Sequence, residues 1–71
     1  MQRGQIPPID QFIRRRDVVR ITGIPQSTLY SMMACGDFPP SYRLGKRTVA
    51  WKASEIAAWM RSRPAYKARS V

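Results

Sequence analysis

Two short apolar runs at helical spacing, separated by a glycine, form the clearest pattern in the chain. Val18, Val19 and Ile21 give the first run an apolar side, and Gly23 ends it because glycine readily adopts the positive φ that helix ends commonly need. A second run begins almost at once at Pro25, whose missing N–H is no loss in a first helical turn. The pattern predicts two short helices hinged at Gly23.

The second predicted helix has two unlike sides. Leu29, Met32 and Met33 fall at i, i+3 and i+4 and are predicted to be buried together. The opposite side carries small, uncharged residues: Ser27, Ser31 and Ala34, flanked by Thr28 and Tyr30. A helix that meets only solvent usually carries charged residues there, so this side indicates a close partner. Helix, glycine turn and helix form the helix-turn-helix pattern of DNA-binding domains, although most helical hairpins of small domains are only packing units.

After the second helix, the glycine and prolines of residues 36–40 prevent further helix, and Phe38 is predicted to anchor this loop to the core. Apolar and polar positions then alternate on both sides of a tight turn at residues 45–47, which predicts a β-hairpin. Its apolar side is predicted to contain Tyr42, Leu44, Val49 and Trp51. Its cationic residues, as in a DNA-binding wing, are Arg43, Lys46 and Arg47.

Helical spacing returns over residues 52–63 and stops at Pro64. The apolar stripe of this third helix consists of Ile56, Trp59 and Met60. Phe12 and Ile13 are candidates for the core or for a short edge strand, and we interpret Trp51 and Trp59 as core residues rather than as groups that stack on bases. The predicted fold is α+β, mostly α: a winged helix-turn-helix with two short helices, a β-hairpin wing and a closing third helix. We expect a flexible N-terminal arm over residues 1–11, the domain over 12–63 and a basic disordered tail over 64–71.

Charge narrows the class of partner. The 71 residues carry 13 Lys and Arg against 4 Asp and Glu, a formal net charge of +9. Such an excess repels itself and indicates a polyanion, here nucleic acid, because solubility alone would be served by a smaller and more mixed charge. The run Arg14 to Arg16 could be a solvated face or a set of phosphate contacts.

Familiar catalytic chemistry is poorly represented in the composition. One cysteine and no histidine leave neither an internal disulfide nor the usual zinc sites, and the four acids are dispersed. We therefore expect no enzyme activity and no cofactor. No apolar run approaches a membrane span and the amino terminus lacks a signal-peptide core, so we expect a soluble, intracellular protein without membrane contact. The glycines and prolines that interrupt the predicted helices also argue against a membrane-active basic peptide, because an amphipathic helix on a membrane surface would run uninterrupted.

Five short motifs occur in an order typical of one protein family. They are Thr22 and Gly23 at the turn; Ser27, Thr28, Leu29 and Tyr30 in the second helix; Gly36, Phe38 and Pro39 after it; Arg43, Leu44 and Gly45 entering the wing; and Trp51 followed by Ile56 and Trp59. From Phe12 to about Arg63 the chain resembles the AlpA-like phage and prophage regulators, which are related to excisionases and to MerR-type regulators. Pro25 stands where this family commonly has serine, Gln26 where it has a basic residue and Arg15 where an apolar residue is frequent.

The resemblance implies a transcriptional regulator that binds specific double-stranded DNA, or an excisionase-type recombination directionality factor that also bends it. It also implies a cytoplasmic, nucleoid-associated bacterial protein. The second helix, about 26–35, would lie in the major groove, with Ala34 near a thymine methyl group, and the wing, 42–51, on the adjacent minor groove. The expected DNA-binding residues are Arg14, Arg16, Arg20, Gln26, Ser27, Thr28, Tyr30, Ser31, Arg43, Lys46 and Arg47. Candidate partners besides DNA are an integrase, RNA polymerase and further copies of the chain on DNA. An RNA-binding or ribosome-associated protein is the more remote alternative, and it would display stacking aromatics on a sheet.

Overall fold

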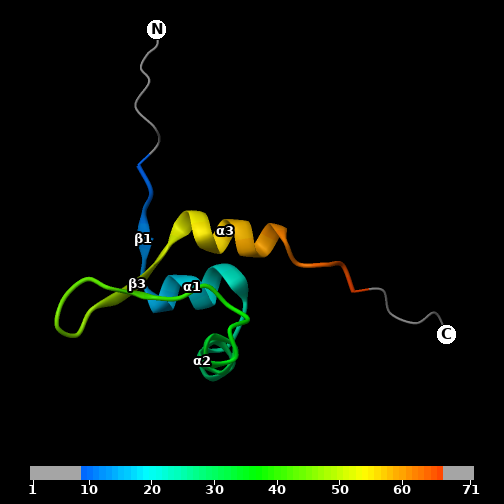
Figure 1. Ribbon diagram of the computed structural model, residues 1–71, viewed down its shortest axis with the longest axis horizontal. Helices are drawn as coiled ribbons and strands as arrows, with labels where there is room; N and C mark the ends of the chain where they lie inside the picture. Colours follow the sequence, from blue (N-terminus) through cyan, green and yellow to red (C-terminus); the bar gives the residue numbers. More distant parts are fainter. Residues whose placement is uncertain (1–8, 67–71) are drawn as a thin grey trace, which may run out of the picture.

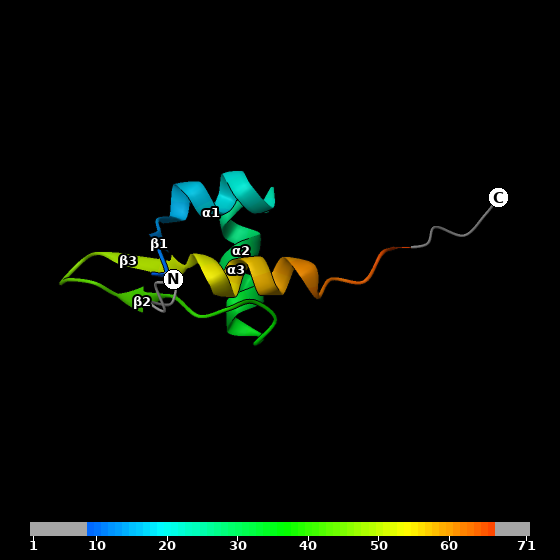
Figure 2. The ribbon, with the colours of Figure 1, turned by 90° about the horizontal axis from the view of Figure 1, so that it is seen from above.

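A computed structural model describes residues 9–66 of the chain. Its elements, in chain order, are β1 (Phe12–Ile13), α1 (Arg15–Thr22), α2 (Gln26–Ala34), β2 (Tyr42–Arg43), β3 (Val49–Lys52) and α3 (Ala53–Arg61) (Figure 1). Three helices and one small antiparallel sheet confirm the predicted winged helix-turn-helix of the α+β class. In Figures 1 and 2 the wing and the C-terminal end of α3 point to opposite ends of the molecule, and α2 runs across the other two helices.

The three strands pair in the order β1-β3-β2, so the last strand in the sequence is the central one. Both pairings are antiparallel, with Ile13 opposite Trp51 and Tyr42 opposite Ala50. Directly opposite residues point to the same face of a sheet, and neighbours along a strand point to opposite faces. Tyr42 therefore lies on the face opposite to that of Trp51, and the prediction of one shared apolar side for the hairpin is wrong.

Burial in the hairpin follows the position of the third strand. Ala50 and Trp51 are both fully buried although they point to opposite faces: Trp51 belongs to the core cluster, and Ala50 is a small residue on the face that carries Tyr42, its partner in β2. Leu44 and Val49, predicted to be on the buried side, are 46% and 37% exposed. Leu44 lies in the wing beyond β2, and Val49 lines an open hollow beside the start of α1, so the buried part of the hairpin ends at Ala50.

The core lies where α1, α2 and α3 meet the sheet. Its buried residues are Ile13, Val18, Leu29, Phe38, Trp51 and Ile56, with Val19, Ile24, Met32, Met33, Ala53 and Trp59 packed against them. The predicted burial of Leu29 and the anchoring role of Phe38 are thus confirmed, as is the packing of both tryptophans. Trp51 is fully buried, whereas Trp59 lies at the border of the core.

Two apolar residues predicted on the buried stripes are instead exposed. Ile21 is 42% exposed because it lies about 60° around α1 from Val18, on the side away from Val19. Met60 belongs to the last turn of α3, which extends past α1 in both ribbon views, so nothing covers it fully. The apolar stripes are therefore narrower than the sequence pattern suggested.

The chain just before β1 is tied to the start of α3. The Ala53 N–H donates to the Gln11 carbonyl at 2.7 Å, and the Ser54 N–H donates to the Asp10 carboxylate at 3.1 Å. The Ser54 hydroxyl donates to the same carboxylate, and these bonds, with that from the Gln11 N–H, lower the pKa of Asp10 below its usual value. Asp10 thereby caps α3 from a distant part of the chain.

The terminal segments were expected to form an arm and a tail. Residues 1–8 of the expected arm and residues 67–71 of the expected tail lie outside the described residues. No helix between residues 9 and 66 combines the length and the apolar character that spanning a lipid bilayer requires.

Candidate nucleic-acid interface

The turn between α1 and α2 is built by a glycine in the left-handed conformation. Gly23 has a φ of 75°, and its N–H donates to the Val19 carbonyl at 2.8 Å, which closes α1 in the αL manner. The Thr22 hydroxyl donates to the Val18 carbonyl and accepts from the Ile24 N–H, and these two bonds fix the direction in which the chain leaves α1. α2 then begins at Gln26, with Pro25 at its N-cap rather than inside its first turn.

The far end of α2 is fixed equally firmly. Gly36 has a φ of 79°, its N–H donates to the Met33 carbonyl, and the next N–H, that of Asp37, donates to the Met32 carbonyl. This pair of bonds is the Schellman arrangement, in which only the glycine position needs a positive φ. The indole N–H of Trp59 donates to the Asp37 carbonyl at 2.8 Å, so α3 holds the loop that follows α2.

The outward side of α2 is uncharged and open. Leu29 is fully buried, whereas six residues predicted to face a partner are exposed: Gln26, Ser27, Thr28, Tyr30, Ser31 and Ala34. Their side chains take part in none of the hydrogen bonds between described residues, so their donors and acceptors are available to a ligand. The side of α2 that sequence periodicity singled out is therefore a free polar surface.

The wing presents its cations at the tip. Arg43, Lys46 and Arg47 are all exposed, and the Arg43 guanidinium donates to the Lys46 carbonyl at 3.4 Å, across the turn. Together with Leu44 and Gly45, Arg43 and Lys46 line a shallow hollow of about 400 Å³. Arg43 thus supports the turn, while Lys46 and Arg47 project from it.

A larger hollow lies between the start of α1 and the wing. Its volume is about 570 Å³, and it is lined by Arg14, Arg15, Arg16, Asp17, Arg47 and Val49. We call it the arginine hollow. It brings together Arg14, Arg16 and Arg47, which were predicted as contacts on separate elements, and adds Arg15, which belongs to the same basic run but was not among the residues expected to bind DNA. The signal that could have found Arg15 is its place inside a run of three arginines.

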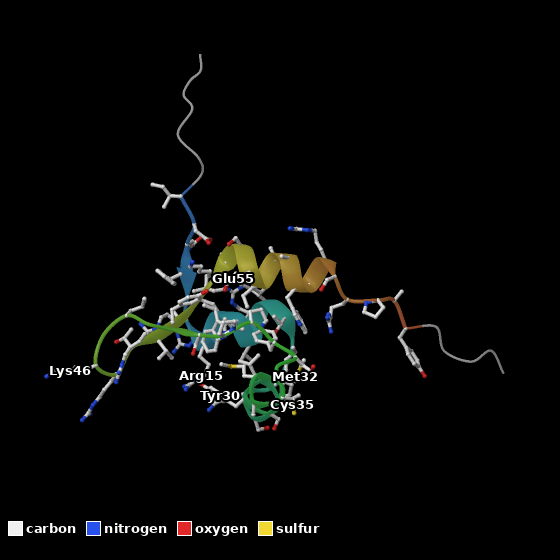
Figure 3. All side chains as sticks on the ribbon, in the orientation of Figure 1. Arg15, Tyr30, Met32, Cys35, Lys46 and Glu55 are labelled. Carbon is white, nitrogen blue, oxygen red and sulfur yellow. The ribbon has the colours of Figure 1, made fainter. Side chains whose placement is uncertain are left out.

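Acidic groups near these cations are engaged elsewhere. The Asp17 carboxylate forms an ion pair with the Arg20 guanidinium at 3.1 Å on the surface of α1. Because Asp17 is paired with Arg20, it does not neutralise the arginines of the hollow. Glu55 of α3 accepts the Tyr42 hydroxyl at 2.9 Å and raises the pKa of that phenol, which keeps it a donor. In Figure 3, Glu55 lies on the α3 side, and Arg15, Tyr30 and Lys46 lie on the opposite side.

An uncharged helix surface, a cationic wing and an arginine hollow on a helix-turn-helix scaffold define the class of winged-helix nucleic-acid-binding domains. Residues 11–64 match the family described as prophage CP4-57 regulatory protein (AlpA), and the chain belongs to that family. It is thus a phage-type, DNA-binding regulatory protein and a member of a regulatory rather than an enzymatic family. A protein of Enterobacteria phage P4, described as uncharacterized protein ORF88, is 41% identical over 66 residues, which span 90% of this chain and 75% of the phage protein.

Proposed function

We propose that the protein binds specific double-stranded DNA, with α2 in the major groove and the wing on the adjacent minor groove, and thereby regulates transcription of phage or prophage genes. The observation that carries this proposal is the exposed, uncharged side of α2, which offers unused hydrogen-bonding side chains. A side of that composition suits base edges, which are read through hydrogen bonds and methyl contacts.

The proposed contacts are of two kinds: some residues read base edges, and others hold the DNA by its backbone or minor groove. Gln26, Ser27 and Ser31 read base edges, while Thr28 and Tyr30 reach bases or phosphates. The holding residues on the wing and α1 are Arg14, Arg16, Arg20, Arg43, Lys46 and Arg47. Arginines at the minor groove benefit from its stronger negative potential over narrow A·T-rich segments.

A helix of nine residues reads only part of an operator, so stable occupancy requires several copies side by side or a protein partner. We propose assembly on DNA, with an integrase or RNA polymerase as the candidate partner. An excisionase-type role would additionally require bending, which is measured by comparing the gel mobility of duplexes that carry the site at the centre or at one end.

The test begins with selection of bound sequences from random duplex DNA at physiological salt. The selected and a scrambled duplex are then titrated with Ser31→Ala and Arg47→Ala at several salt concentrations. Ser31→Ala should change the preference at one or two base pairs by about 1–3 kcal/mol and leave the salt slope unchanged. Arg47→Ala should weaken binding to both duplexes and lower the slope of log K against log salt by about one unit.

Matched controls remove the same groups outside the interface. Ser62→Ala deletes a hydroxyl that bonds the Trp59 carbonyl at the end of α3, and Arg61→Ala deletes a cation there. Neither should alter base preference. If Ser31→Ala instead weakened binding to every sequence equally while Arg47→Ala changed only base preference, the roles assigned to helix and wing would have to be exchanged.

A further inference from the structure

The arginine hollow concentrates four cations from two elements that are far apart in the sequence. Arg14, Arg15 and Arg16 come from the start of α1 and Arg47 from the wing tip. The one acid on its wall, Asp17, is paired with Arg20 on α1 at 3.1 Å. Like charges placed together destabilise a folded chain, so an uncompensated cluster of this kind indicates an anionic ligand.

The lining identifies the chemistry of that ligand. Besides its arginines and Asp17, the hollow has only Val49 on its wall. It therefore offers guanidinium groups, which suit phosphate oxygens, but no aromatic ring or amide that would select a nucleobase. A run of phosphates without base recognition is what the backbone of a DNA strand presents.

We propose that the arginine hollow holds the phosphate backbone of one DNA strand, so that α1 and the wing grip the same segment and Arg15 is a DNA-contact residue. This role depends on the proposed function, because the strand enters the hollow while α2 occupies the neighbouring major groove. Arg15 is exposed and forms none of the ion pairs or hydrogen bonds found between described residues, and it points to the side of the molecule that carries Tyr30 and Lys46 (Figure 3).

Two consequences separate this role from a structural one. A supporting residue stabilises the free domain, whereas Arg15 in a repelling cluster does not, so its removal should leave the melting temperature equal or higher at low salt. Arg15 and Arg47 also face one strand segment, so the loss of one arginine should reduce what the other contributes. Two arginines on distant parts of the DNA would instead act independently.

The experiment compares the wild type, Arg15→Ala, Arg47→Ala, the double variant and the control Arg61→Ala on a short mixed-sequence duplex across a salt series. Arg15→Ala should lower the slope of log K against log salt by about one unit. Raising the salt from about 50 to 200 mM should therefore weaken DNA binding by this variant by a factor roughly 3.5-fold smaller than for the wild type. The double variant should lose less affinity than the product of the two single losses. Arg61→Ala, which lies at the end of α3, should keep the wild-type slope.

Inorganic triphosphate, titrated into the wild type and Arg15→Ala, distinguishes a backbone site from a site for a free oligophosphate. Triphosphate binding that disappears in Arg15→Ala, with duplex binding unaltered, would overturn the assignment to DNA. A wild-type salt slope in Arg15→Ala, a lowered melting temperature, or fully independent losses in the double variant would overturn it too. In each of these cases Ser31→Ala would still shift base preference if the proposed function holds, whereas a wild type that fails to bind duplex DNA would refute that function itself.

Discussion

Trp59 joins α3 to the loop that ends α2, and its removal should loosen both. Its ring meets Phe38 edge to face with centroids 4.7 Å apart, its N–H donates to the Asp37 carbonyl at 2.8 Å, and the Arg63 guanidinium covers it at 4.5 Å. An aromatic pair contributes about 0.5–1.5 kcal/mol beyond burial, and a hydrogen bond about as much. With the loss of apolar contact at the border of the core, Trp59→Ala should cost about 3 kcal/mol, the lower end of the range for buried aromatics.

That loss is large for a chain of this size, whose whole stability is expected to be roughly 4–11 kcal/mol. Each kcal/mol lowers the melting temperature of such a domain by about 4–8 °C, so Trp59→Ala should melt about 12–24 °C below the wild type. Trp59→Phe keeps a ring against Phe38 and removes the donor to Asp37 together with the smaller ring of the indole. It should therefore cost about 1 kcal/mol, or roughly 4–8 °C.

The assay is thermal melting followed by far-ultraviolet circular dichroism, with duplex titration at a temperature where each variant is folded. Folded Trp59→Ala should still bind duplex with the wild-type salt slope, because the tryptophan touches the loop and not the proposed interface. A Trp59→Ala variant that melts like the wild type but has lost DNA affinity would refute the packing role and make the indole a contact group.

Two further predictions concern the ends of helices. Asp10→Asn should melt below the wild type at neutral pH, and the difference in melting temperature should shrink as the pH falls below about 3.8. The reason is that the pKa of Asp10 is lowered in the folded state, so the stabilising charge is lost as the pH falls through this lowered pKa. A constant difference in melting temperature across this range would contradict the capping role. Gly36→Ala should lower the free energy of chemical unfolding by about 1 kcal/mol, because a φ of 79° strains a residue with a Cβ even though no atom lies within 4 Å of the position the Cβ would take. Gly36→Asn should cost less, because asparagine tolerates this conformation, and equal costs for the two variants would indicate a steric cause instead.

Local features of the sequence determined the helix-turn-helix. Glycine is the residue best suited to a positive φ, so Gly23 and Gly36 mark the ends of α1 and α2 without reference to the rest of the fold. Helical periodicity likewise separates the buried Leu29 from the exposed side of α2, because side chains three or four residues apart lie on the same face of a helix. The excess of arginine indicated a polyanionic partner in the same direct way.

Only the tertiary structure decided how distant segments meet. Strand register assigns Tyr42 and Trp51 to opposite faces, and an alternating sequence fits two registers that differ by one residue and exchange the faces. Asp10 caps α3 at Ser54, 44 residues away, and Arg47 joins Arg15 in one hollow, because β3 pairs with β1 as well as with β2. These juxtapositions depend on long-range pairing and not on local spacing, which is why only the folded chain shows Arg15 and Arg47 in one hollow.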